Sequence, residues 1–148
     1  TNRRQRQMCI RDSSIFGQNG PRVGSPAGGA IVAHSANILG HKRAREMWMT
    51  CKRYSAKEIR NWGLVNSVVK KDRLDEEVKK YGDEILKAAP TCLKILKASF
   101  RKQFEEILKI TQKGMVEEVA PGYFKTGEQA EGAKAFLEKR KPNFKKFR

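Results

Sequence analysis

Between Ser14 and Gly40 the chain contains no aspartate or glutamate, although 16 of its 148 residues are acidic. A site built on this stretch has no carboxylate of its own to act as an acid or a base. Cysteine is also scarce. Cys9, Cys51 and Cys92 have no spacing typical of a disulfide framework or a zinc site, so we expect no metal and a reducing, cytoplasmic setting.

Long hydrophobic runs are missing as well. No apolar segment approaches the roughly 20 residues of a membrane-spanning helix, so we expect no membrane partner. The charge balance is basic, with 32 lysines and arginines and a net charge of +16, which raises nucleic acid as a candidate ligand. The basic residues are nevertheless spread along the chain and mixed with acids, as in residues 75–80, which is typical of a solvated helix face. We therefore expect no nucleic-acid partner.

Glycine and proline are concentrated in residues 15–29, which hold five of the twelve glycines and two of the five prolines. Such a segment cannot continue a helix. An apolar, alanine-rich run follows over residues 30–39, so the order predicts the end of a strand, a glycine-rich loop and the start of a helix. Backbone N–H groups there can bind an anion or a polarised carbonyl, although a tight turn without a ligand has the same pattern.

Local signals predict the other elements. A capping box of Ser55 and Glu58 predicts a short helix ending at Gly63, followed by a strand over residues 64–69. Apolar periodicity predicts further helices over residues 41–51, 74–89, 91–110 and 112–119, and a last one starting near Thr126. Apolar side chains are expected to face inward from two of them, namely Ala44, Met47, Trp48 and Cys51 in one and Ala130, Ala133, Phe136 and Leu137 in the last.

Six short motifs occur in a fixed order: Phe16-Gly-Gln, Gly20-Pro-Arg-Val-Gly-Ser25, Gly40-His-Lys-Arg-Ala-Arg-Glu-Met-Trp48, Tyr54-Ser-Ala-Lys-Glu, Gly63-Leu-Val-Asn66 and Ala135-Phe-Leu-Glu-Lys-Arg-Lys-Pro-Asn-Phe144. In this order they resemble the crotonase (enoyl-CoA hydratase/isomerase) superfamily. Within it they look most like the branch of 1,4-dihydroxy-2-naphthoyl-CoA synthase and related cyclic ketoacyl-CoA hydrolases. The resemblance runs from Ile15 to the C-terminus.

The resemblance implies an α/β fold and a division of the chain. Residues 14–71 would form the C-terminal part of the crotonase ββα spiral core. Residues 72–148 would form a helical C-terminal region with a basic tail, which in the family packs on neighbouring subunits of a homo-oligomer, a trimer or a hexamer.

Residues 1–13 fall outside this pattern. The pentapeptide Met8-Cys-Ile-Arg-Asp12 is similar to a translated transposon-end adapter, so we expect residues 1–13 to be a non-native, adapter-derived segment. Members of the family are about twice as long, and the chain is expected to be a C-terminal half. The other half would hold one oxyanion-hole N–H and much of the coenzyme A pocket.

The resemblance also implies a chemistry. Crotonases hold a thioester carbonyl with two N–H groups so that an enolate forms beside it, and they need a positioned acid or base. The hydratases use two glutamates, one of which would fall at Gly20, and the missing carboxylate argues against that mechanism. In the naphthoyl-CoA synthase branch, which also has glycine here, a bicarbonate ion is the base. It would sit on Gln18, Asn19 and Gly20, with Trp48 lining the pocket, although loop-closing hydrogen bonds explain Gln18 and Asn19 equally well.

Substrate contacts follow from the same alignment. Ser25 matches a serine that hydrogen-bonds the substrate in that branch, although it could equally cap the following helix. Ala27 stands where the branch has aspartate, and Phe124, with Tyr123 beside it, stands where a tyrosine reaches the substrate. These departures leave the exact reaction open.

Two residues near the C-terminus match coenzyme A contacts. Lys139 corresponds to a lysine that binds a CoA phosphate, and Phe136 lies near the adenine in the family. An exposed lysine and a core phenylalanine are the alternatives, and for Phe136 alone we expect the core.

The sequence therefore predicts an acyl-CoA enzyme that forms the enolate of a CoA thioester, its substrate, for carbon–carbon bond formation or cleavage. One alternative is an enoyl-CoA hydratase or a ring-opening hydrolase of a cyclic acyl-CoA. The other, from a different class, is a non-catalytic, basic helical module that binds an anionic partner.

Overall fold

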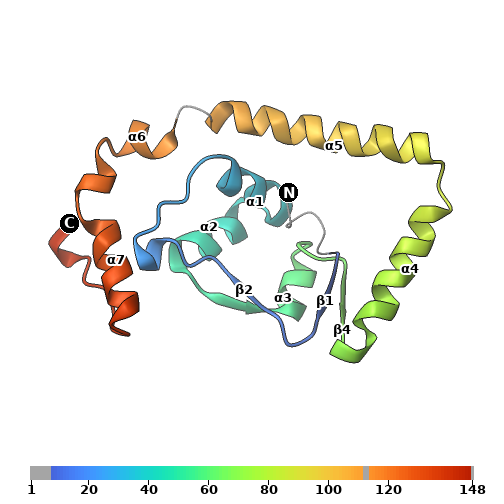
Figure 1. Cartoon of the computed structure of the whole chain (residues 1–148), viewed down its shortest axis with the longest axis horizontal. Coiled ribbons are helices and arrows are strands. Elements are labelled where there is room, and N and C mark those ends of the chain that lie inside the picture. The colour runs from blue at the N-terminus through green and yellow to red at the C-terminus, as the bar shows by residue number, and fades with distance from the viewer. Residues whose placement is uncertain (1–7, 112–113, 148) are drawn as a thin grey trace. The chain divides into compact units, whose positions relative to one another are not determined.

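A computed structural model describes residues 8–111 and 114–147 (Figure 1). Within this part of the chain, two compact units form from segments that alternate in the sequence. The first unit joins residues 8–16 to 53–105, and the second joins residues 17–52 to 106–147. The boundaries that the sequence places after residues 13 and 71 stay predictions.

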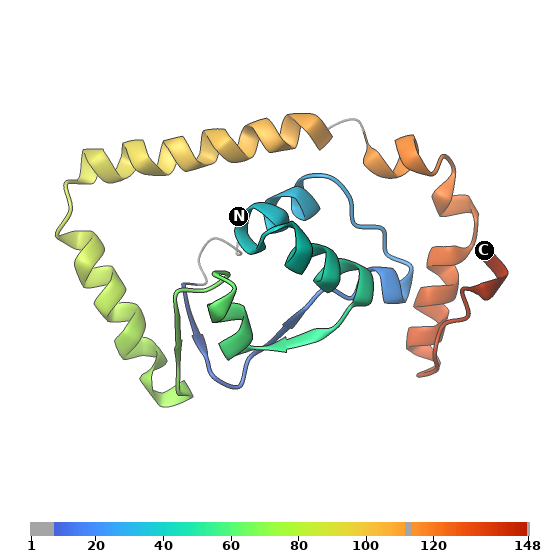
Figure 2. The same cartoon turned by 180° about the vertical axis from the view of Figure 1, so that it is seen from behind.

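Short strands begin the first unit. Strand β1 (Cys9–Arg11) pairs in parallel with β4 (Ser67–Val69), with Ile10 opposite Val68, and the two run side by side in Figure 2. Strand β2 (Ile15–Gly17) pairs with β3 (Arg53–Ser55). The strand predicted over residues 64–69 is shorter than expected, because the Leu64 N–H still bonds back to the carbonyl of Ile59.

Helix α3 (Ala56–Asn61) has the capping box that the sequence predicts. The Glu58 N–H donates to the Ser55 hydroxyl at 3.3 Å, and the Ser55 N–H donates to the Glu58 carboxylate at 2.8 Å. The helix fills the centre of the unit, since the side chains of Ala56 and Ile59 are fully buried. Half-buried Trp62 follows the helix and packs on Tyr54 with 4.5 Å between the ring centroids.

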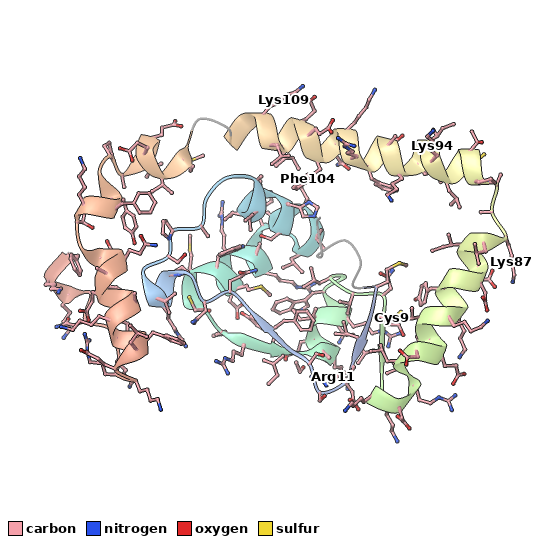
Figure 3. All side chains as sticks on the ribbon, in the orientation of Figure 1. Cys9, Arg11, Lys87, Lys94, Phe104 and Lys109 are labelled. Carbon is pink, nitrogen blue, oxygen red and sulfur yellow. The ribbon has the colours of Figure 1, made fainter. Side chains whose placement is uncertain are left out.

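Helices α4 (Leu74–Leu86) and α5 (Pro90–Thr111) follow the short 3-10 turn η3 (Lys71–Arg73). Helix α5 begins one residue earlier than predicted, because proline is well tolerated in the first turn of a helix. Helix α4 ends three residues before the predicted limit, and the exposed Lys87 follows at the turn between the two helices (Figure 3). Within residues 8–111 and 114–147, no helix combines the length and the apolar composition of a membrane-spanning segment.

In the second unit, α1 (Ala30–Leu39) and α2 (His41–Thr50) lie side by side in both views (Figures 1 and 2). Gly40 separates them with a φ of 78°, and its N–H closes α1 on the carbonyl of Ala36. A left-handed residue at a helix end favours glycine. The predicted inward face of α2 is confirmed, because all four of its members are buried: Ala44, Met47, Trp48 and Cys51.

The rest of this unit consists of the glycine-rich loop before α1 and the C-terminal segment from residue 106 onward. A 3-10 turn, η2 (Pro21–Val23), lies in the glycine-rich loop. Helix α6 (Met115–Val119), the turn η4 (Tyr123–Lys125), helix α7 (Glu128–Leu137) and the turn η5 (Lys145–Phe147) follow in chain order. The helix predicted over 112–119 begins with two residues outside the described part, and the last helix starts at Glu128 rather than near Thr126.

The inward face predicted for α7 is wrong. Phe136 and Leu137 are 74% and 80% exposed, and Ala130 and Ala133 are also exposed. The buried residues of α7 are instead Glu131, Gly132 and Ala135. The core position expected for Phe136 is therefore corrected to an exposed one. The reason lies in how closely α7 approaches the glycine-rich loop.

Candidate functional site

All the residues that the sequence proposes for the site belong to the second unit. Gln18, Asn19, Gly20 and Ser25 come from the glycine-rich loop, and Trp48 comes from α2. The others lie in η4 and around the end of α7: Tyr123, Phe124, Phe136 and Lys139. The site can therefore be described within a single compact unit.

The loop is folded around the carbonyl group of Gly20. This oxygen accepts two backbone hydrogen bonds, from the N–H of Val23 at 3.0 Å and from the N–H of Ser25 at 2.9 Å. A Cβ atom at Gly20 would lie 2.7 Å from the Ser25 carbonyl oxygen, which is closer than real Cβ atoms approach. No side chain fits at this position unless the backbone moves. A glutamate at Gly20, as in the two-glutamate hydratases, is incompatible with this conformation.

The outer part of the loop offers polar groups. Gln18 is half-buried, whereas Asn19 and Ser25 are exposed. Ser25 does not cap the following helix, because α1 starts at Ala30 with Gly29 as its N-cap residue and has no side-chain cap. The first turn of α1 also carries no acidic side chain. The loop and the first turn of α1 thus carry amide and hydroxyl groups and no carboxylate of their own.

Trp48 ties α2 to α1. Its indole N–H donates to the Ser35 hydroxyl at 2.8 Å, and that hydroxyl donates in turn to the Val32 carbonyl at 2.7 Å. The side chain is 8% exposed. The N–H of Trp48 is therefore engaged within the unit, and any contact with a bound anion would come from its ring. Its place in the pocket wall stays a prediction.

Residues of η4 and α7 contact the backbone of the glycine-rich loop at Val23 and Gly24. The Tyr123 hydroxyl donates to the Gly24 carbonyl at 2.7 Å. Gly24 has a φ of 63°, and a Cβ atom there would lie 2.7 Å from the Glu128 carbonyl oxygen. Gly132 of α7 is closer still, because its Cβ would overlap the carbonyl of Val23. Only glycine permits these approaches. This explains why the face of α7 that carries Gly132 turns inward.

Burial raises the pKa of the Tyr123 hydroxyl, and the nearby Glu128 carboxylate raises it further. The hydroxyl therefore stays protonated and remains a hydrogen-bond donor at neutral pH. Its neighbour Phe124 is 61% exposed and meets the Tyr123 ring edge-on, with 5.5 Å between the centroids. The ring of Phe124 is therefore accessible to a substrate, whereas the hydroxyl of Tyr123 is engaged by the Gly24 carbonyl of the loop.

Lys139 and Phe136 lie at the exposed end of α7. Lys139 has a φ of 53°, and its N–H donates to the Phe136 carbonyl at 3.2 Å, while the next N–H, of Arg140, donates to the Ala135 carbonyl at 3.0 Å. This left-handed turn ends the helix. An exposed aromatic ring and an exposed ammonium group therefore lie within one turn of each other.

A buried carboxylate that the sequence did not single out anchors this end of the chain. Glu131 is 9% exposed and accepts a two-point ion pair from Arg140 at 2.7 and 3.2 Å. It also accepts the N–H of Asn143 at 2.8 Å, and the Lys146 ammonium lies 3.7 Å away. The hydrogen bonds from Arg140 and Asn143, with these positive charges, lower the pKa of Glu131 to about 2. No spacing rule in the sequence pairs these residues.

The described residues 8–111 and 114–147 contain no group of three or more histidine, cysteine, aspartate or glutamate side chains that could hold a metal ion. The polar groups collected at the loop are amides, hydroxyls and backbone N–H groups. These suit an anion or a polarised carbonyl better than a metal cation.

Comparisons with known proteins give a family match and a set of similar solved structures. The family model described as enoyl-CoA hydratase/isomerase matches residues 8–147. Among solved structures, a methylmalonyl-CoA decarboxylase in complex with 2-nitronate-propionyl-CoA superposes with a TM-score of 0.78 at 22% identity over 92% of this chain and 53% of its own. An enoyl-CoA hydratase/isomerase from Pseudoalteromonas atlantica gives 0.76 at 26% identity over 92% and 54%. An enoyl-CoA hydratase subunit from Geobacillus kaustophilus gives 0.58 at 30% identity over 93% and 53%. The chain thus spans about half the length of these structures.

The Glu131 anchor generates a pH prediction. Its folded pKa of about 2 lies below the unfolded value of about 4.3. The stability it contributes is therefore present above about pH 4.3 and is lost as the pH falls toward about 2. In urea titrations over this window, we expect the free energy of unfolding of Glu131→Gln to fall less steeply than that of the wild type.

The matched control is Glu118→Gln, because Glu118 is exposed and lies on α6. This variant should keep the wild-type dependence on pH. If Glu131→Gln and the wild type followed parallel curves from pH 5 to pH 2, the anchor would not be a source of folding energy.

Proposed function

Because the chain belongs to the enoyl-CoA hydratase/isomerase family, also known as the crotonase superfamily, we propose that it carries part of the site of an acyl-CoA enzyme. The proposed reaction forms an enolate beside the carbonyl of a CoA thioester and then makes or breaks a carbon–carbon bond. We propose a reaction of the 1,4-dihydroxy-2-naphthoyl-CoA synthase type, which the order of the sequence motifs resembles. The family match supports the acyl-CoA substrate, and the observation that carries the proposed type of base is the lack of space for any side chain at Gly20.

The lack of space at Gly20 limits which group can act as the base that removes the proton next to the thioester carbonyl. A carboxylate cannot be placed at Gly20 without moving the Ser25 carbonyl, and residues 14–40 contain no acid that could replace it. An amide at half-buried Gln18, an amide at exposed Asn19 and the backbone of Gly20 suit a small anion instead. We propose bicarbonate, which would supply the base for removing the proton next to the thioester carbonyl.

The chain's own residues would orient the substrate. The exposed Ser25 hydroxyl and the exposed ring of Phe124 are the proposed substrate contacts, with Asn19 next to the anion. The ring of Phe136 and the ammonium group of Lys139 would hold the adenine and a phosphate of coenzyme A. An aromatic surface beside a positive charge suits an adenine nucleotide, because the ring stacks while the charge pairs with phosphate.

The reaction is tested by isotope exchange. The assay uses the product of the whole parent gene, with acyl-CoA thioesters that are linear or carry a ring ketone, in heavy water. We expect deuterium to enter at the carbon next to the thioester carbonyl, as mass spectrometry would detect. Exchange alone adds deuterium and no oxygen, whereas the hydratase or the ring-opening hydrolase would add one whole heavy water, with one deuteron fixed on carbon and the oxygen on the other product carbon. If no thioester showed either deuterium exchange or gain of water, the proposal of an acyl-CoA enzyme would be contradicted.

Coenzyme A binding has its own test. A phosphate contact from an exposed lysine contributes about 1 kcal/mol, so Lys139→Ala should weaken CoA binding about fivefold in calorimetry. Lys125→Ala removes another exposed charge, from η4, and should leave the Kd unchanged. Tripolyphosphate at the same salt concentration is the competing probe. Equal binding of CoA and tripolyphosphate, with equal effects of both substitutions, would favour the non-catalytic basic module.

We also propose that the helical region packs on further copies of the chain. The side chains of Ile95, Leu96 and Phe100 on α5 are 60%, 54% and 67% exposed. Leu96 and Phe100 lie four residues apart and share a helix face, so they form an apolar surface that water solvates poorly.

In sedimentation velocity, Phe100→Glu should shift the protein to a smaller assembly, because a charge would enter the apolar contact. Lys102→Glu introduces glutamate at an already charged, exposed position of α5 and should keep the wild-type mass. A wild-type protein that sediments as a monomer, or an unchanged mass for Phe100→Glu, would exclude this surface as the contact.

A further inference from the structure

The peptide group that joins Gly24 to Ser25 is held at both of its polar ends. Its carbonyl oxygen, on Gly24, accepts the Tyr123 hydroxyl at 2.7 Å. Its N–H, on Ser25, donates to the Gly20 carbonyl at 2.9 Å. Because a peptide group is planar and rigid, two such bonds fix the orientation of the whole plane. The side chain of Ser25 leaves the backbone directly after it.

From this arrangement we infer that Tyr123 is a positioning residue that sets the conformation of the loop from Gly20 to Ser25 rather than a contact to substrate. The inference rests on the proposed function for what the loop does, but not for how the loop is held. Tyr123 acts on Gly24 directly and reaches Gly20 only through the Ser25 N–H. It thereby fixes the part of the loop on which the anion and the substrate are proposed to bind.

The surroundings of the bond support this role. Gly24 is in the left-handed region, with a φ of 63°, and has no space for a side chain against the Glu128 carbonyl. The loop backbone therefore lies directly on the C-terminal segment, which places the carbonyl within reach of the phenol. The hydroxyl is partly buried, so water competes weakly for the same carbonyl. The phenol ring carries no charge that would repel an anion.

The first test removes only the hydroxyl. In Tyr123→Phe, hydrogen exchange of the Ser25 and Val23 amides should become about two- to tenfold faster, the range expected for one lost hydrogen bond. Amides of α1 and α2 should keep their wild-type rates. Tyr81→Phe is the matched control, because it removes a hydroxyl from a half-buried tyrosine of α4, in the other unit.

Unchanged exchange at Ser25 in Tyr123→Phe would overturn the inference. An equal increase over the whole second unit would overturn it too, because it would indicate a general loss of stability. If Tyr123→Phe fails to fold, 3-fluorotyrosine at position 123 replaces it. This residue is a stronger donor of nearly the same size, and it should slow exchange at Ser25, whereas unchanged exchange would again contradict the assignment.

The second test uses the whole parent enzyme. If Tyr123 positions the loop, Tyr123→Phe should raise both the bicarbonate concentration for half-maximal rate and the KM for the acyl-CoA, because Gly20 and the proposed substrate contact Ser25 both belong to that loop. A smaller fraction of folded enzyme would lower kcat and move neither constant. A wild-type rate that does not depend on bicarbonate would exclude bicarbonate as the base, and the exchange test at Ser25 would still decide the role of Tyr123.

Discussion

Direct packing of backbone on backbone is the constraint on which the second unit depends. Helix α7 approaches the glycine-rich loop so closely that Gly132 meets the Val23 carbonyl and Gly24 meets that of Glu128. Such contact requires positions without side chains on both surfaces. The rotation of α7, the exposure of Phe136 and the placement of Tyr123 behind the loop are consequences of this one contact.

The two sides of the glycine-rich loop have different roles because of this contact. Its inner side is occupied by carbonyl groups that bind N–H and O–H donors of the protein, including the Gly20 oxygen with two donors. Its outer side keeps the polar groups of Asn19 and Ser25 exposed. A loop whose carbonyl groups already accept hydrogen bonds from the protein does not need to reorganise around a ligand. Preorganised polar groups of this kind are what the proposed enolate chemistry would require.

The sequence predicts those features whose cause lies within a few residues. Gly40 ends α1, and Ser55 with Glu58 starts α3, because each signal acts on its own turn. The order of motifs likewise predicts the superfamily, which the family model confirms. The α/β fold of that superfamily is confirmed by solved structures that share it.

Features that depend on distant segments could not be predicted in this way. Apolar periodicity points the wrong face of α7 inward, because the decisive partner of Gly132 is a carbonyl more than a hundred positions earlier. The Glu131 anchor joins residues only 9 and 12 positions apart, but it too depends on a turn of the chain that no local pattern indicates. Its acceptor atoms are filled by Arg140 and Asn143 only after the chain has turned back past the end of α7. An isolated glutamate in a helix gives no sign of this.

The bond between Tyr123 and Gly24 also carries a consequence for the order of assembly. The two residues are 99 positions apart, so their meeting closes a long loop of chain and is entropically costly. Helix α1, helix α2 and the capping box involve only near neighbours and can form early. The loop that is proposed to hold the substrate therefore takes its final shape after these local elements. On a ribosome, residues 123 and 132 must both have left the exit tunnel first, because Tyr123 and Gly132 both contact the loop.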